Sequence, residues 1–328
     1  MQNNRYPEIL DKLMTPAEAV KRFIKDGSQL ALGGFTVSRN PMALVYEIVR
    51  QGIKDLHLVC HSQGQSLDIL IGAGSVRRVE IAYGANGRFA STCVRFRKAV
   101  ERGEIEVEDY SNNQMSLRFL AGALGIPFVP TISGFQTDLL AKEGFPADIR
   151  GKGKVALHKF GVVKNPFKAE EEEEVLVVPA LSPDVALVHA PYVGDDGTVR
   201  IKGLTFADIE EAKSADKVIV TCDEILPREF MRMEPDQNSL PSFLVDAIVP
   251  VPYGAHPTAC PFLYDYDANH LNTYRERARE DDSFKSYLEE WVYDIENHED
   301  YLEKIGGACL TAIRANSVMG YAPGLDRR

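Results

Sequence analysis

The sequence predicts an α/β protein in which an open, largely parallel sheet is covered by helices on both faces. Short apolar segments alternate with amphipathic helical segments from residue 15 to residue 125, and glycines separate one segment from the next. Apolar strand segments continue after residue 174. Strands that alternate with helices of this length need crossover connections, which place neighbouring strands parallel and bury both faces of the sheet. We expect one domain over residues 1–328.

The first half of the chain contains most of the predicted elements. A Thr-Pro-Ala-Glu capping box at residues 15–18 begins the first helix, and Gly27 follows it. The Asn40-Pro41 pair begins a second helix with one apolar stripe, which ends at Gly52. The remaining elements are strands at 29–32, 56–60, 79–83 and 105–107, a polar loop at 61–65, and helices at 67–71, about 92–102 and about 114–124.

The second half is predicted to extend the same architecture, with strands at 175–178, 185–189, 218–222 and 244–249. Residues from about 145 to 174 are rich in glycine, lysine and proline and end in five glutamates, which favours a charged, solvated loop. A helical segment is expected at about 270–304, and packing of its apolar face against the core or a partner is favoured over an aromatic ligand cage. That face consists of Phe284, Tyr287, Leu288, Trp291, Val292 and Ile295.

The composition limits the function and the location. The chain has 37 basic and 48 acidic side chains and a formal charge of −11, so its surface disfavours nucleic acids and anionic membranes. No run of about 18 apolar residues and no apolar amino-terminal segment predicts a membrane span or a secretion signal. The five cysteines form no C-x-x-C pair, and we expect reduced thiols in the cytoplasm.

No metal site is expected from the spacing of potential ligands. Cys60 with His61, and His256 with Cys260, are the pairs that could be considered. Neither pair has the spacing of a known ligand motif, and a buried thiol at the end of an apolar segment is an ordinary core residue.

Three loops are expected to converge where the first three strands end, because the carboxyl ends of parallel strands lie at one edge of the sheet. They cover residues 33–41, 61–65 and 84–88. Gly33 and Gly34 would let a ligand or another part of a chain approach the backbone, and Arg39 could hold a carboxylate or phosphate. A tight turn with a surface arginine, and a structural role for His61, are the plainer alternatives.

The same loops contain no recognisable nucleophile. The dinucleotide G-x-G-x-x-G, the phosphate-binding G-x-x-x-x-G-K-[ST] and the G-x-S-x-G elbow are all absent. Ser62 beside His61 does not constitute a triad, and none of these loops contains a glutamate. The sequence therefore indicates only part of an active site.

Several stretches of the chain, in a fixed order and spacing, carry a resemblance to a known family. They are Gly33-Gly34-Phe35-Thr36 with Arg39 and Pro41, Tyr83 with Asn86, and residues 95–98, 108–111, 123–128, 196–201, 253–257 and 263–267. Together they resemble the A (alpha) subunit of family I coenzyme A transferases, and most of all the glutaconate type. The resemblance extends from about Met14 to about Gly306.

This resemblance implies the open α/β fold of CoA transferases, which is similar to that of sugar-phosphate isomerases, and a B subunit that completes a hetero-oligomer. A glutamate of the B subunit would attack an acyl-CoA thioester, form an acyl anhydride and then a glutamyl-CoA thioester, and pass CoA to a second small carboxylic acid. No catalytic residue is then expected in this chain, and coenzyme A enters as a thioester substrate and not as a permanently bound cofactor.

The resemblance also implies which residues line the substrate site, with Arg39, Ser62, Gln63 and Asn86 as contacts to carboxylates and amides. The expected set is Gly33, Gly34, Phe35, Thr36, Arg39, His61, Ser62, Gln63, Asn86 and Asn112. Ala43 occupies the place of the oxyanion-hole asparagine of the 3-ketoacid branch, as in the glutaconate type. Asn112 replaces a glutamine, and residues 60–63 are bulkier and more polar than in glutaconate enzymes. The identity of the acid substrate is therefore left open.

Two alternatives to CoA transfer remain. Relatives that lack the partner's glutamate would hydrolyse or decarboxylate CoA esters on the same scaffold. A non-catalytic regulator that binds a small molecule is the other class, and this sequence has no appended DNA-binding module for that role.

Overall fold

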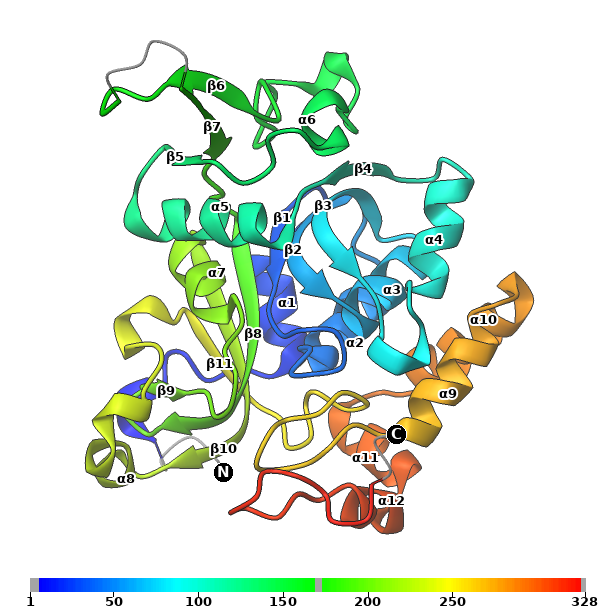
Figure 1. Ribbon diagram of the computed structural model, residues 1–328. Coiled ribbons are helices and arrows are strands. Elements are labelled where there is room, and N and C mark those ends of the chain that lie inside the picture. The colour runs from blue at the N-terminus through cyan, green and yellow to red at the C-terminus, as the bar shows by residue number, and fades with distance from the viewer. Residues whose placement is uncertain (1–5, 169–172, 326–328) are drawn as a thin grey trace.

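The computed structural model describes residues 6–168 and 173–325 and contains the expected open, largely parallel sheet (Figure 1). All neighbouring pairs along the main path of the sheet are parallel, and β9 (Val199–Arg200) pairs antiparallel with β8. From one edge to the other the strands are β11 (Ala247–Pro250), β10 (Lys217–Leu226), β8 (Val185–Gly194), β1 (Gln29–Leu32), β2 (Leu56–Gln63), β3 (Val76–Gly84) and β4 (Glu106–Asp109).

Helices alternate with these strands as predicted. In the first half they are α1 (Pro16–Phe23), α2 (Met42–Arg50), α3 (Gln65–Gly72), α4 (Val94–Glu101) and α5 (Asn112–Leu124). The others are α6 (Asp138–Ala141), α7 (Asp208–Ser214), α8 (Arg228–Met233), α9 (Ala268–Arg277), α10 (Asp281–Leu288), α11 (His298–Ile305) and α12 (Gly307–Ala312). None of the helices in the described ranges has the length and apolar character needed to cross a bilayer.

The two faces of the sheet carry side chains of different size. Leu30, Leu32 and Leu58 pack with apolar residues of α1 to α4 in the largest core. On the other face Ala31, Val59 and Ala186 pack with residues of α5, among others. Because successive strand residues point to opposite faces, this alternation places helices on both sides, and the small residues let α5 lie close to the sheet.

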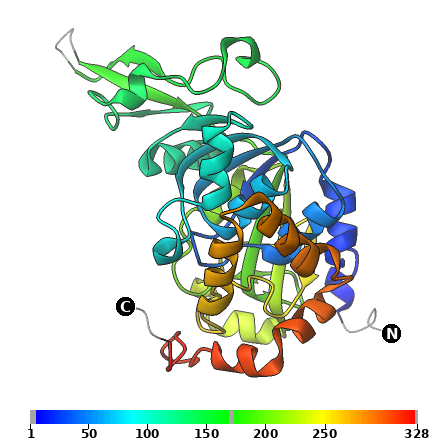
Figure 2. The same cartoon turned by 90° about the vertical axis from the view of Figure 1, so that its right-hand side faces the viewer.

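A second, three-stranded antiparallel sheet projects from this body (Figure 2). Its strands, in spatial order, are β5 (Phe128–Thr131), β7 (Glu174–Pro179) and β6 (Gly161–Lys164). The prediction that residues 175–178 continue the parallel sheet is therefore wrong, since β7 pairs antiparallel with both neighbours. The expected loop at 145–174 also contains a strand, β6, and residues 170–172 of its glutamate run lie outside the described residues.

The second strand is longer than predicted. Residues 61–63 were expected in a polar loop, but β2 continues to Gln63 because Ser62 and Gln63 pair with Tyr83 and Gly84 of β3. Polarity does not end a strand whose backbone groups are satisfied by a neighbouring strand. The side chains of residues 61–63 are consequently fixed on the sheet.

The carboxyl-terminal segment is helical, but it is not one continuous helix. The predicted apolar face runs through α10 into a π-helical turn, η6 (Glu289–Tyr293), and a bend follows it before α11. Tyr287, Trp291 and Tyr301 lie among other aromatic rings there. Most of this face joins the largest core of the chain, which confirms packing against the core.

His270 makes the stability of this aromatic region dependent on pH. Its Nε2 lies 2.8 Å from the Tyr287 hydroxyl, and burial lowers the pKa of His270 to about 3. The unfolded chain takes up a proton near pH 6.5, whereas the folded chain does not, so stability falls as the pH decreases below 6.5. We expect wild type to lose roughly 3 kcal/mol more than His270→Gln between pH 6.5 and 4, measured by urea denaturation of the full chain.

The control for this pH effect is His158→Gln, which removes an exposed histidine. This variant should follow the wild-type curve. A His270→Gln chain with the same pH dependence as wild type would show that His270 is not the group that titrates on unfolding.

Candidate functional site

The carboxyl ends of β1, β2 and β3 meet, as the sequence predicts for the three loops. The Thr36 N–H donates to the Ser62 carbonyl oxygen at 3.3 Å, and the Ala85 N–H donates to that of Gln63 at 2.8 Å. Gly64 lies between them, since a Cβ atom there would be 2.3 Å from the Thr36 carbonyl oxygen. The strand ends therefore form one tightly packed edge.

The glycine pair after β1 is required by the packing of this chain on itself. Gly34 has φ +88°, and a Cβ there would lie 2.5 Å from the Ser38 carbonyl oxygen. A Cβ on Gly33 would lie 2.9 Å from the Leu187 carbonyl oxygen of β8. The close approach expected at these glycines is thus made by the loop itself and by a neighbouring strand.

Arg39 is completely buried, so the alternative of a surface arginine is wrong. Its Nη2 lies 2.6 Å from Asp208 Oδ2, and Asp208 Oδ1 accepts a hydrogen bond from the Gly34 N–H at 2.6 Å. Asp208 is the first residue of α7. The Asp208 carboxylate therefore binds both Gly34 and Arg39 of the loop after β1. It also balances the charge of the Arg39 guanidinium, which was expected to bind a carboxylate of the substrate.

Glu211 lies one turn further along α7 and is also buried. Its carboxylate has no hydrogen bond to another side chain in the described part of the chain, and the backbone of His61 lies beside it. Burial, followed by the charge of Asp208, raises the pKa of Glu211 well above its usual range. This environment favours the protonated form of the Glu211 side chain.

Gln63 and Asn86 are buried parts of the frame. The Gln63 Nε2 donates to the Leu32 and Gly33 carbonyl oxygens, at 2.5 and 2.6 Å, and its Oε1 accepts from the Ser66 hydroxyl at 2.7 Å. The Asn86 Nδ2 donates to the Gln65 Oε1 at 2.9 Å. The Gln63 amide thus holds the strand ends together and has no free proton for a ligand.

Phe35, His61 and Asn112 form the more open part of the expected site. The Phe35 ring stacks on Phe206 at 4.2 Å and lies 6.1 Å from the His61 ring. The Ser62 hydroxyl donates to Asn112 Oδ1 at 2.9 Å, so the exposed Asn112 amide keeps its N–H groups for another acceptor. Burial lowers the pKa of His61, and its imidazole is neutral near pH 7.

The nearby acid and thiol groups are unsuited to nucleophilic attack. Burial raises the pKa of the Glu211 carboxyl and of the Cys60 thiol well above their usual ranges. Two surface hollows lie elsewhere. One, of about 820 Å³, is lined by Tyr46, Arg50 and Tyr301 among others, and the second, of about 590 Å³, lies beside Phe262. Neither hollow is lined by the residues expected at the substrate site.

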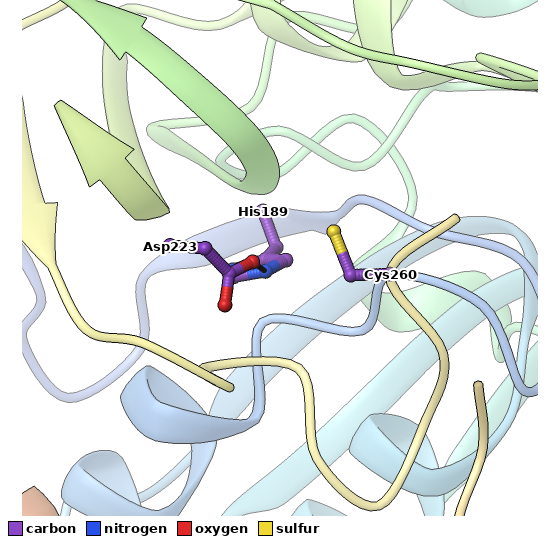
Figure 3. Close-up of side chains that lie close together, drawn as sticks. All are labelled: His189, Asp223 and Cys260. Carbon is purple, nitrogen blue, oxygen red and sulfur yellow. Dashed lines mark hydrogen bonds and ion pairs between the residues drawn. The ribbon is translucent and has the colours of Figure 1, made fainter. Parts of the chain in front are cut away.

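One group of side chains in the described residues could hold a metal ion. It consists of His189, Asp223 and Cys260, and neither of the pairs considered from the sequence forms it (Figure 3). None of the three belongs to the set expected at the substrate site, although the residue next to Cys260, Ala259, accepts a hydrogen bond from the Arg39 N–H at 2.7 Å.

Sequence reasoning missed Asp208 and this buried group for the same reason. Asp208 is 169 positions from Arg39, and Asp223 is 34 positions from His189. No local pattern relates residues at such distances. An aspartate in the first turn of a helix is ordinarily explained by the helix dipole.

Comparison with known proteins gives a consistent set of similarities. The family model described as coenzyme A transferase matches residues 13–250. The A subunit of glutaconate CoA-transferase from Acidaminococcus fermentans is 39% identical over 313 residues, which are 95% of this chain and 97% of that protein. The A subunit of 3-oxoadipate CoA-transferase from Pseudomonas knackmussii is 32% identical, and the match covers 90% of this chain and 98% of that protein.

Solved structures agree with the sequence comparison. The crystal structure of glutaconate coenzyme A-transferase from Acidaminococcus fermentans has a TM-score of 0.91, with 96% of this chain and 98% of that chain covered. A structure of the decarboxylase AibA/AibB has a TM-score of 0.70 at 31% identity, with 85% of this chain and 98% of that chain covered.

Proposed function

This chain belongs to the coenzyme A transferase family, and from that premise we propose that it is the A subunit of a two-subunit enzyme that moves CoA between carboxylic acids. The observation that carries the proposal is the similarity, over 95% of the chain, to a protein named as the A subunit of glutaconate CoA-transferase. Hydrolysis or decarboxylation is less favoured, since the decarboxylase structure has the lower TM-score, 0.70 against 0.91.

The proposed chemistry needs an attacking carboxylate from the B subunit. Its glutamate adds to the thioester carbonyl of acyl-CoA and expels CoA thiolate, which leaves an acyl-glutamyl anhydride. The thiolate then attacks the glutamyl carbonyl and releases the free acid, and the same steps in reverse load a second acid. No bound cofactor takes part in these steps. Burial raises the pKa of Cys60 and Glu211, which agrees with an attacking group from the partner.

This chain would supply a rigid wall against which the acid is positioned. The buried hydrogen bonds of Gln63 and the Arg39–Asp208 pair fix the strand ends, and Phe35, His61 and Asn112 face the open side. Fixed donors cost little reorganisation when charge develops on a carboxylate or thioester oxygen.

We also place the enzyme in the cytoplasm, since all five cysteines are free.

The test compares three samples, this chain by itself, the B subunit by itself and their complex, each with an acyl-CoA and an acceptor acid. Only the complex should exchange CoA, and mass spectrometry should find an acyl-CoA-dependent CoA adduct on a glutamate in the partner. Changing that glutamate to glutamine should abolish both signals. Full exchange by this chain without its partner, or exchange without any adduct, would refute the proposal.

Asn112→Ala should weaken binding of the acceptor acid. The exposed amide keeps free N–H groups because Ser62 occupies its oxygen, and a hydrogen bond to a charged group contributes about 1.5–3 kcal/mol. We expect the KM for the acid to rise roughly tenfold or more, with a smaller change in kcat. Steady-state kinetics of the complex measures both values.

The matched control is Asn113→Ala, which removes a neighbouring exposed amide from the same helix turn. It should leave the KM unchanged. Equal effects of the two substitutions would indicate a general change in the helix start, and no particular role for Asn112.

A further inference from the structure

Three buried side chains with different donor atoms, those of His189, Asp223 and Cys260, lie close together (Figure 3). His189 comes from β8, Asp223 from β10 and Cys260 from the loop that follows β11. Their donor atoms all lie within 4.8 Å of one another. The side chains of His189 and Cys260 are completely buried, and Asp223 is 8% exposed.

Two oxygen atoms lie within hydrogen-bond distance of the same ring nitrogen of His189. His189 Nε2 lies 2.9 Å from Asp223 Oδ2 and 3.3 Å from the Tyr264 hydroxyl. The Tyr264 oxygen also accepts from the Ala255 N–H at 3.1 Å. Nε2 carries at most one proton, so a hydrogen bond donated to one of the two oxygens beside it leaves the other contact weaker.

A metal ion at this point would accept a lone pair from the imidazole, the carboxylate, the thiolate and the phenol oxygen. We propose that His189, Asp223 and Cys260, with the Tyr264 hydroxyl as the fourth donor, bind a zinc ion in a closed structural site. Imidazole and thiolate ligands favour zinc over magnesium or calcium. Tetrahedral bonds of about 2.0–2.3 Å hold donor atoms roughly 3.3–3.8 Å apart, and the three ligand atoms of His189, Asp223 and Cys260 already lie within 4.8 Å of one another.

The charges of this site balance on binding. With Cys260 as a thiolate and Asp223 as a carboxylate, the two ligand charges would neutralise Zn²⁺. A buried ion without net charge avoids the cost of an unpaired charge in the core. Without a cation, burial raises the pKa of Cys260 well above its usual range, and the thiol stays protonated.

The surrounding contacts are those that orient metal ligands. The other ring nitrogen of His189, Nδ1, lies 2.8 Å from the Thr221 hydroxyl. The second oxygen of Asp223, Oδ1, accepts a hydrogen bond from the Tyr253 N–H. Such outer partners fix the ring and the carboxylate of metal sites, and both are present here.

The site would stabilise the loop after β1 through the residue beside Cys260. The Arg39 N–H donates to the Ala259 carbonyl oxygen at 2.7 Å, and the Ala259 N–H donates to that of Val37 at 2.9 Å. A zinc ion at Cys260 would therefore tie the wall of the proposed substrate site to β8 and β10. This proposal replaces the expectation, based on ligand spacing, that the chain holds no metal.

The test measures the zinc content of the full chain, which is purified in complex with its partner and then dialysed into metal-free buffer. Wild type should retain about one zinc ion for each copy of this chain. Cys260→Ser and His189→Gln should lower this content at least about tenfold. Cys309→Ser is the control, because this half-buried thiol contacts Asp267 at 3.0 Å and lies outside the group.

A second measurement covers the possibility that the ligand variants do not fold. Wild type grown with cobalt in place of zinc should show the near-ultraviolet absorption of thiolate-to-cobalt charge transfer and the visible bands of a tetrahedral ion. Wild type that contains neither zinc nor this cobalt spectrum overturns the proposal. Loss of zinc from the Cys309→Ser variant, or full zinc content in the Cys260→Ser variant, overturns it as well.

Discussion

Asp208→Asn is expected to lower the free energy of unfolding of the full chain by about 3–5 kcal/mol. The Asp208 side chain is 1% exposed and its partner Arg39 is completely buried. Asparagine keeps the shape but removes the charge, which leaves a buried guanidinium without a counter-ion. Because Asp208 also binds the Gly34 N–H at 2.6 Å, the loop after β1 should loosen, and CoA exchange by the complex should fall with it.

Urea denaturation measures the loss of stability, and Glu210→Gln serves as the control. Glu210 is a half-buried carboxylate two positions along the same helix, so its replacement tests whether any acid of α7 has this effect. We expect a change within about 0.5 kcal/mol for the control. An Asp208→Asn chain as stable as wild type would show that Arg39 finds other compensation, for example from Glu211.

Local patterns in the sequence were sufficient for the elements that begin or end at a specific residue. The predicted capping box at Thr15 is present, with the Thr15 N–H donating to Glu18 Oε2 at 2.8 Å and the Glu18 N–H donating to Thr15 Oγ1 at 3.2 Å. Gly125 ends α5 in the left-handed conformation. These signals depend on residues within one turn of each other, and they are readable without tertiary structure.

The errors arose where distant segments decide the structure. An apolar run such as 175–178 suits a parallel or an antiparallel strand equally well, and only pairing with β5 and β6 placed it in the small sheet. Arg39 was expected to hold a substrate carboxylate, or alternatively to lie on the surface, because its buried partner Asp208 is 169 positions away in the sequence. The convergence of three strand ends was predictable from topology, whereas the partner of each side chain was not.

Gly64→Ala should disrupt the edge where the three strand ends meet. A Cβ at this position would lie 2.3 Å from the Thr36 carbonyl oxygen, 2.5 Å from Asn86 Oδ1 and 2.8 Å from the Ala85 carbonyl oxygen. Two of these atoms belong to backbone that is held by hydrogen bonds, so they cannot rotate away. We expect a loss of about 1–3 kcal/mol in stability, and a fall of roughly 100-fold in kcat of the complex because the wall shifts.

Gly307→Ala is the matched control, since a Cβ there has no neighbour within 4 Å and the residue begins α12. This variant should keep full activity and gain up to about 1 kcal/mol. Adding Asn86→Gly to Gly64→Ala removes one of the three close contacts and leaves both carbonyl oxygens. Thermal melting and kcat should then recover only in part. Complete recovery would mean that the Asn86 side chain alone prevents a Cβ at Gly64, and that the backbone of the neighbouring loops can move.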